Sequence, residues 1–134
     1  MGNLSQPQHH TATIMVVDDE ESITLFLSAL LSSRGYQVIT FNDPATALHH
    51  FENEFETVDL VISDQTMPGM TGTEMATQMF MLRPALPFLL CTGYSDAIDK
   101  PRAQALGLGG FLHKPYKSNE LLAIMQTLLA GSSS

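Results

Sequence analysis

Five polar side chains in this sequence follow short runs of mostly apolar residues, and together they could bind a cation: Asp18, Asp19, Asp64, Thr92 and Lys114. Two unit charges about 4 Å apart interact by about 4 kcal/mol at an effective dielectric constant of about 20. A fold that gathers three carboxylates must therefore protonate one of them or supply a cation. Lys114 offers one positive charge, and Mg²⁺, which prefers oxygen ligands and keeps several waters, offers more. The sequence has no His/Cys cluster of the zinc-binding kind.

Taken one at a time, the same residues have structural interpretations. Asp18 can cap the helix that follows it, because Asp18-Asp19-Glu20-Glu21 resembles a capping box, and this role can coexist with metal binding. Asp64 can form a turn, Thr92 can be structural at a strand end, and Lys114 can be a solvated charge. The functional interpretation therefore depends on whether the fold brings these side chains together.

The order of the apolar segments indicates that it does. Short apolar runs predict five strands, and the segments between them carry apolar residues at helical spacing. The expected strands are residues 13–17, 38–41, 58–63, 87–91 and 110–113. Gly35 is expected to end the first helix, Asp43 and Pro44 to begin the second, and Ser118 to cap the last. Continuous apolar strands that alternate with helices predict an α/β fold with a doubly wound parallel sheet. Functional residues of such sheets gather at the carboxyl ends of the strands.

Length and composition fit one domain of this kind. The chain has 134 residues, 44% of them hydrophobic, and a net charge of -8, which argues against direct binding to nucleic acid. Cys91 is the only cysteine, which excludes an internal disulfide. No apolar run could span a bilayer and no signal peptide is recognisable, so we expect a cytoplasmic domain without membrane contact. We place the domain at residues 13–130, between flexible tails at 1–12 and 131–134.

Four segments at the expected strand ends carry a family resemblance. They are residues 14–20 (IMVVDDE), 59–72 (DLVISDQTMPGMTG), 92–93 (TG) and 111–116 (FLHKPY). With them the chain resembles the response-regulator receiver domains of two-component phosphorelays, over residues 13–129. The second segment is the most specific of the four. The resemblance implies a flavodoxin-like (βα)5 fold with strand order 2-1-3-4-5.

The resemblance also implies roles for the acidic residues. Asp64 is then the phosphoacceptor, which takes a phosphoryl group from a phosphohistidine on a histidine kinase or a histidine phosphotransfer protein. Asp19, Asp64 and the backbone carbonyl of Thr66 are expected to bind Mg²⁺, with Asp18 acting mostly through water. The domain is expected to be a signalling module rather than an enzyme, and to regulate a downstream protein that the sequence does not identify. A second copy of the chain, in a homodimer, is a further candidate partner.

Three other residues are implied to respond to the phosphoryl group. Lys114 is expected to contact a phosphoryl oxygen, and Thr92 to hydrogen-bond the group once it arrives. Phe111 is the aromatic residue expected to change rotamer with Thr92. The Lys114–Pro115 peptide bond is expected to be cis.

The sequence departs from the commonest family pattern at two places. Gly93 follows Thr92 where a small residue other than glycine is usual, and residues 93–96 (GYSD) resemble the corresponding loop of receivers in hybrid histidine kinases. Tyr94 could take part in partner docking. Phe111 replaces a frequent tyrosine, so a hydroxyl contact outside the pocket is lost. These departures concern the conformational response, not the phosphoacceptor.

Two alternatives remain open. A Mg²⁺-dependent phosphatase of the haloacid-dehalogenase class would use an aspartyl nucleophile with a second acid two residues later, but that position holds Thr66. A receiver-like interaction module that is never phosphorylated is the other alternative. The joint presence of Asp19, Asp64, Thr92 and Lys114 argues against it without excluding it.

Overall fold

The computed structural model describes residues 11–93 and 98–132, in which five strands alternate with five helices. The elements in chain order are β2 (Thr13–Val17), α1 (Glu21–Ser33), β3 (Gln37–Phe41), α2 (Pro44–Glu54), β4 (Leu60–Asp64), α3 (Gly72–Leu82), β5 (Phe88–Thr92), α4 (Lys100–Ala105), β6 (Gly110–His113) and α5 (Ser118–Ser132). All pairings are parallel, and the sheet order is β3-β2-β4-β5-β6. The first strand of the chain thus lies between the second and the third, which confirms the predicted order 2-1-3-4-5.

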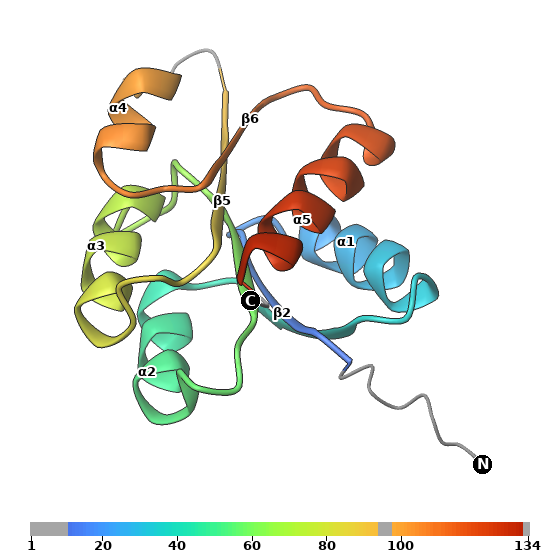
Figure 1. Ribbon diagram of the computed structural model, residues 1–134, viewed down its shortest axis with the longest axis horizontal. Coiled ribbons are helices and arrows are strands. Elements are labelled where there is room, and N and C mark those ends of the chain that lie inside the picture. Colours follow the sequence, from blue (N-terminus) through green and yellow to red (C-terminus); the bar gives the residue numbers. More distant parts are fainter. Residues whose placement is uncertain (1–10, 94–97, 133–134) are drawn as a thin grey trace.

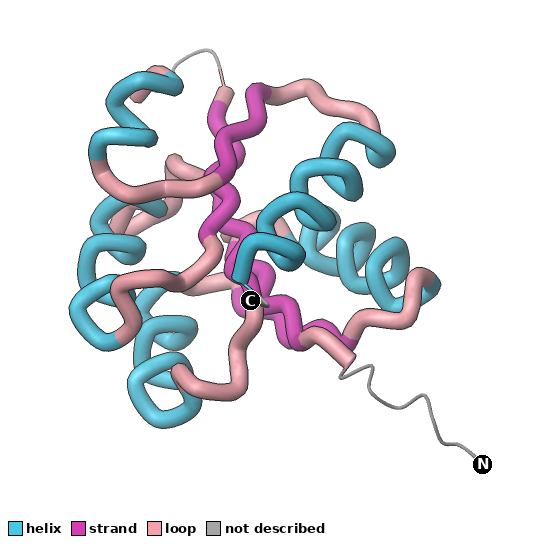
Figure 2. Tube along the Cα trace, in the orientation of Figure 1, coloured by secondary structure: helices cyan, strands magenta, loops and turns pink. Residues whose placement is uncertain are grey.

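Helices cover both faces of the sheet. Helices α1 and α5 lie on one side, and α2, α3 and α4 lie on the other (Figure 1). The strands run between these two layers (Figure 2). Successive strand residues face opposite sides. In β2, Ile14 and Val16 pack in the core beneath α1 and α5, whereas Met15 and Val17 pack in the core beneath the other three helices. This double burial explains why the strands are continuous apolar runs rather than alternating ones.

Local sequence explains where the helices on one face begin. Asp43 caps α2 by accepting a hydrogen bond from the Thr46 N–H at 2.9 Å, with Pro44 as the first helical residue. Helix α3 begins with a full capping box, in which Thr71 and Glu74 each accept a hydrogen bond from the other's backbone N–H. The predicted start of α2 is therefore confirmed.

Two predicted helix caps are wrong. Asp18 does not cap α1, because Glu20 occupies the N-cap position and α1 begins at Glu21. Ser118 does not cap α5 either, since it is already the first helical residue. The preceding residue, Lys117, accepts the first backbone hydrogen bond of α5, and its own N–H donates to the Glu120 carboxylate at 2.8 Å. A short polar residue thus predicts a helix start only to within a residue or two.

Several element boundaries also differ from the sequence prediction. Strands β3, β4 and β5 begin one or two residues away from the expected positions 38, 58 and 87. Strands β4 and β5 end at Asp64 and Thr92 themselves, so these two residues are the last of their strands rather than the first of the following loops. Helix α5 continues to Ser132 and includes Gly131, which the sequence assigned to a flexible tail. Glycine weakens a helix but does not end one unless the chain turns there.

Gly72 holds the start of α3 against the end of β4. A Cβ atom at this position would lie 2.4 Å from the backbone oxygen of Asp64 and 2.8 Å from Leu90 Cδ1, so a side chain cannot fit without a backbone shift. The Ser63 hydroxyl donates a hydrogen bond of 2.8 Å to the same Asp64 oxygen. The close approach of Gly72 and the Ser63 hydrogen bond hold the backbone of Asp64 in place at the carboxyl end of β4.

Candidate functional site

Three acidic side chains meet at the carboxyl edge of the sheet. Asp18 and Asp19 follow β2, and Asp64 ends β4, the strand that pairs with β2. One carboxylate oxygen from each residue lies within 4.8 Å of the other two. Asp18 is buried, Asp64 is half-buried and Asp19 is exposed, so the cluster opens to solvent on one side. The predicted convergence of these acids is therefore present in the structure.

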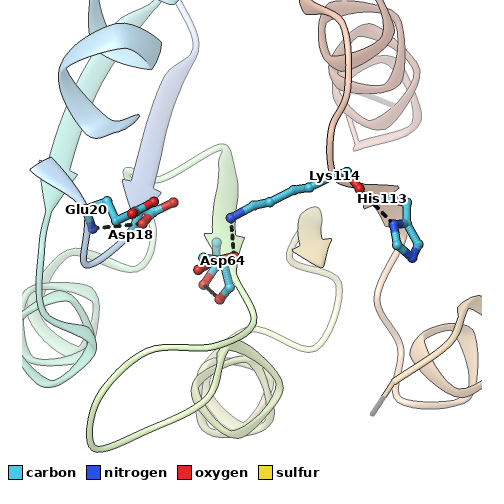
Figure 3. Close-up of polar contacts among 6 residues, drawn as sticks. Asp18, Glu20, Asp64, His113 and Lys114 are labelled. Atoms are coloured by element: carbon cyan, nitrogen blue, oxygen red, sulfur yellow. Dashed lines mark hydrogen bonds and ion pairs between the residues drawn. The ribbon is translucent and has the colours of Figure 1, made fainter. Parts of the chain in front are cut away.

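Lys114 supplies a positive charge to the cluster. It follows β6, and its side chain reaches toward Asp64 (Figure 3). Its Nζ lies 2.7 Å from Asp64 Oδ1, with 32% of the Lys114 side chain and 11% of the Asp64 side chain exposed. Partial burial lowers the pKa of Lys114, but the hydrogen bond to Asp64 and the charges of Asp64 and Asp18 outweigh it, so the net pKa is raised. Lys114 is therefore a fixed ammonium at neutral pH.

The charged form of the Asp18 carboxylate is disfavoured in this cluster. Burial of the side chain, which is 4% exposed, is the main cause that raises the pKa of Asp18 from 3.8 to about 6. The Glu20 N–H donates to Asp18 Oδ1 at 2.9 Å and opposes the rise, whereas the negative charge of Asp64 adds to it. A set of oxygen ligands with an excess of negative charge suits a hard divalent cation. The residues present therefore fit Mg²⁺.

Thr92 ends β5, the strand that pairs with β4, and Phe111 lies on β6, the strand that pairs with β5. Thr92 is fully buried at the end of β5, and its Oγ1 has no hydrogen-bond partner within residues 11–93 and 98–132. Its backbone oxygen accepts a hydrogen bond of 2.7 Å from the Lys114 N–H, which joins the two polar ends of β5 and β6. Phe111 pairs with Leu90 across the same two strands and is half-buried against the core. An unpaired buried hydroxyl is a costly feature that calls for an explanation.

The family comparison interprets this geometry. Residues 14–126 match the family model described as the response regulator receiver domain. This chain belongs to that family. It is a receiver domain of the two-component response-regulator type.

Individual relatives agree with the family. The receiver domain is 32% identical over 117 residues to the sensory transduction protein RegX3 of Mycolicibacterium smegmatis, covering 87% of this chain and 50% of RegX3. It is 34% identical over 119 residues to the alkaline phosphatase synthesis regulator PhoP of Bacillus subtilis, covering 89% of this chain and 49% of PhoP. The chain thus spans about half the length of these relatives.

Solved structures give the same fold. The chemotaxis protein CheY4 of Vibrio cholerae is 33% identical with a TM-score of 0.80, covering 90% of this chain and 100% of that one. A response regulator receiver domain protein from Clostridium thermocellum is 26% identical with a TM-score of 0.85, covering 90% and 95% of the two chains. The flavodoxin-like prediction is confirmed.

Family membership supports broader statements about the site. Receiver domains generally bind Mg²⁺ at an acidic pocket, and response regulators interact with histidine kinases and with downstream targets. In this chain Asp18, Asp19 and Asp64 form a cluster of acidic side chains. No helix in the described part of the chain has the length and apolar character needed to cross a bilayer.

The remaining predicted features have mixed outcomes. The Lys114–Pro115 bond is cis, as expected. Thr66 is exposed in the loop between β4 and α3, and the role of its carbonyl stays a prediction. Tyr94 and the rest of the segment at 94–97 lie outside the described residues, so the docking role of Tyr94 and the likeness to hybrid-kinase receivers also stay predictions.

Sequence reasoning missed two side chains that hold the loops of the site. Asn42 follows β3 and donates hydrogen bonds to the backbone oxygen of Asp18 and to the hydroxyl of Thr24. Gln65 follows Asp64, and its side-chain amide accepts from the Thr73 N–H at 2.9 Å and donates to the Thr73 hydroxyl at 3.1 Å. The bonds of Asn42 join segments far apart in sequence and those of Gln65 cross a loop, and no local pattern indicates them.

Replacing Asp18 with Asn is expected to stabilise the metal-free receiver domain by about 1–3 kcal/mol at pH 8. The ordinary pKa is 3.8 and the folded value is about 6, so the folded state binds more protons between these values. The charge of Asp18 therefore lowers stability progressively through this range, and fully only above about pH 6. The gain should shrink as the pH falls from 8 to 5.

Urea unfolding in the presence of EDTA measures this gain. The matched control is Glu52→Gln, which removes one negative charge from the exposed surface of α2. Equal effects of the two substitutions at pH 8 would show that only net charge matters, and would contradict a specific penalty at Asp18.

Proposed function

We propose that this receiver domain accepts a phosphoryl group on Asp64 from a phosphohistidine and switches conformation to regulate a partner protein. The observation that carries the proposal is the ion pair of 2.7 Å between Lys114 Nζ and Asp64 Oδ1 within a cluster of three carboxylates. A carboxylate is a usable nucleophile for phosphorus, and the transfer depends mostly on positioning and charge neutralisation.

Mg²⁺ is the cofactor of this proposal. Asp19, Asp64 and the backbone carbonyl of Thr66 would hold it, and Asp18 would act mostly through water. When bound, Mg²⁺ supplies positive charge that offsets the carboxylates and stabilises the charge on phosphoryl oxygens. The support is the all-oxygen ligand set and the raised pKa of Asp18, to about 6, which comes mainly from burial and in smaller part from the negative charges of Asp64 and Asp19.

The proposed transfer exchanges one bond for another. An oxygen of the Asp64 carboxylate attacks the phosphorus, an O–P bond forms, and the N–P bond to the donor imidazole breaks. The electron pair of that bond returns to the imidazole nitrogen. Lys114 holds its ammonium at Asp64 Oδ1 and is positioned to contact a phosphoryl oxygen once the group has arrived. The product is an acyl phosphate on Asp64.

The conformational switch would use the buried hydroxyl of Thr92. A phosphoryl group on Asp64 would bring acceptor oxygens to the next strand end, and the buried Oγ1 of Thr92 could donate to one of them. Movement of Thr92 would change the space open to the half-buried Phe111 on β6. The response is a shift between two populated states rather than a new fold.

The wider role follows from this chemistry. The donor would be a histidine kinase or a histidine phosphotransfer protein, in the cytoplasm, and the receiver domain would act as a signalling module rather than as an enzyme that turns over substrate. Its output would be a changed surface that a downstream protein, or a second copy of the chain, recognises. A direct contact with nucleic acid or membrane is not part of the proposal.

Mapping of the modified residue tests the proposal. The receiver domain is incubated with Mg²⁺ and a phosphorylated histidine kinase, or with a small phosphodonor such as phosphoramidate, and the labelled residue is identified by mass spectrometry after reductive trapping of the acyl phosphate. A Mg²⁺-dependent label on Asp64 is expected. A label on another residue, or continued hydrolysis of small phosphate esters, would overturn the proposal in favour of a different chemistry.

A further inference from the structure

We propose that Asn42 is a positioning residue for the acidic pocket, and that its side-chain amide sets the affinity of the pocket for Mg²⁺. The inference rests on the proposed function, because it concerns the geometry of the same metal site. Asn42 carries no charge and lies after β3, the strand at the edge of the sheet. Its side-chain amide contacts the Asp18 backbone oxygen and the Thr24 hydroxyl, so the proposed role is to position the acidic loop.

The first contact joins Asn42 to the acidic loop. Its Nδ2 donates a hydrogen bond of 2.8 Å to the backbone oxygen of Asp18. The residue before it, Phe41, accepts a hydrogen bond of 3.1 Å from the Asp18 N–H. The end of β3 thus holds the backbone of Asp18 on both sides, through one main-chain and one side-chain contact.

The second contact joins Asn42 to α1. The same Nδ2 lies 3.0 Å from Thr24 Oγ1, whose residue is 2% exposed in the first turn of the helix. The Thr24 hydroxyl donates its own proton to the Glu21 oxygen at 3.0 Å, so it accepts from Asn42. One amide group therefore bridges the end of β2 and the start of α1, which are the two ends of the loop that carries Asp19.

The bridge matters because the pocket repels itself. Three carboxylates within 4.8 Å favour spreading of the loop, and exposed Asp19 is the one most able to move outward. The Asp18 carbonyl belongs to the peptide plane that continues into Asp19. Holding that oxygen fixes the plane, and with it the direction in which the Asp19 side chain leaves the backbone. Asn42 thus preorganises a ligand that it does not touch, as outer residues of metal sites do.

The test is the Mg²⁺ dissociation constant of Asn42→Ala, measured on the whole chain by NMR titration of the amide signals of Asp19 and Glu20. Affinity is expected to fall about three- to tenfold, in line with loss of one well-placed hydrogen bond beside a metal site. The matched control is Asn53→Ala, which removes an exposed amide that donates to the His49 oxygen at 2.9 Å within α2. The control should leave the Mg²⁺ affinity unchanged.

A second measurement separates positioning from stability. Urea unfolding in EDTA gives the stability of each variant without metal, and titrations are made where every variant is folded. The proposal is supported if fully folded Asn42→Ala binds Mg²⁺ more weakly than the wild type while Asn53→Ala binds it with the wild-type affinity. If Asn42→Ala does not fold, Thr24→Val takes its place. It keeps the contact of Asn42 with Asp18 and removes the one with Thr24, together with the bond from the Thr24 hydroxyl to the Glu21 oxygen. Thr24→Val should then weaken Mg²⁺ binding as well, by a smaller factor.

The outcomes distinguish this inference from the proposed function. The metal site itself would be contradicted if the wild-type amide signals did not shift with Mg²⁺, or if Asp19→Asn left those shifts unchanged. Wild-type protein that binds Mg²⁺, together with an Asn42→Ala variant (or, in its place, Thr24→Val) of unchanged affinity, would overturn the positioning role alone.

Discussion

Asp64→Asn is expected to lower phosphoryl incorporation by at least about a hundredfold, in the presence of Mg²⁺ and a small phosphodonor. The amide is nearly isosteric with the carboxylate but is a far weaker nucleophile toward phosphorus. It also removes one of the three clustered negative charges and the ion pair with Lys114. Intact-mass spectrometry after timed incubation measures the incorporation.

The control for Asp64→Asn makes the same chemical change at the opposite end of the same strand. Asp59 lies just before β4, where its carboxylate accepts a hydrogen bond of 2.7 Å from the Thr13 N–H. Asp59→Asn should incorporate phosphoryl groups at the wild-type rate. Incorporation by Asp64→Asn at that same rate would show that the acceptor is another residue.

The fold could be predicted from the sequence because its strands are buried on both faces. In β2 and β4, successive residues pack into the two different cores, so each strand reads as a continuous apolar run. Parallel strands bring their carboxyl ends to one edge, which is why Asp18, Asp19, Asp64 and Lys114 could be expected to meet. The meeting is a consequence of topology and needs no knowledge of side-chain conformation.

Features that depend on loop geometry were not predictable in the same way. The sequence offered Asp18 as a helix cap. In the structure its carboxylate accepts a hydrogen bond from the Glu20 N–H, Glu20 is the N-cap residue and α1 begins at Glu21. Asn42 contacts Asp18 from 24 residues away, and such a contact leaves no periodic signal. That the Thr92 hydroxyl has no hydrogen-bond partner among the described residues is likewise visible only when its surroundings are known. Burial and partners, not residue type, decide these roles.

Lys114→Ala is expected to separate metal binding from phosphoryl uptake. The ammonium lies 2.7 Å from Asp64 Oδ1 and therefore competes with a cation for that oxygen while it balances the charge of the pocket. Without it, the three carboxylates keep their full mutual repulsion, so the Mg²⁺ affinity should stay the same or increase. Phosphoryl incorporation from a small donor should fall about a hundredfold, because one fixed positive charge no longer faces the charge on the phosphoryl oxygens.

Lys117→Ala is the matched control for this charge. Lys117 is three residues further along the same connection and exposed, and its backbone rather than its side chain makes the contacts that begin α5. This variant should behave like the wild type in both measurements. If Lys114→Ala loses Mg²⁺ affinity and phosphoryl uptake together, its ammonium holds the pocket in shape instead of acting on the phosphoryl group. If it loses neither, the 2.7 Å ion pair has no part in the transfer. A direct electrostatic role is supported only if phosphoryl incorporation falls while the Mg²⁺ affinity is kept. Loss of the pocket geometry would lower both quantities, and a lysine without a role in the transfer would change neither.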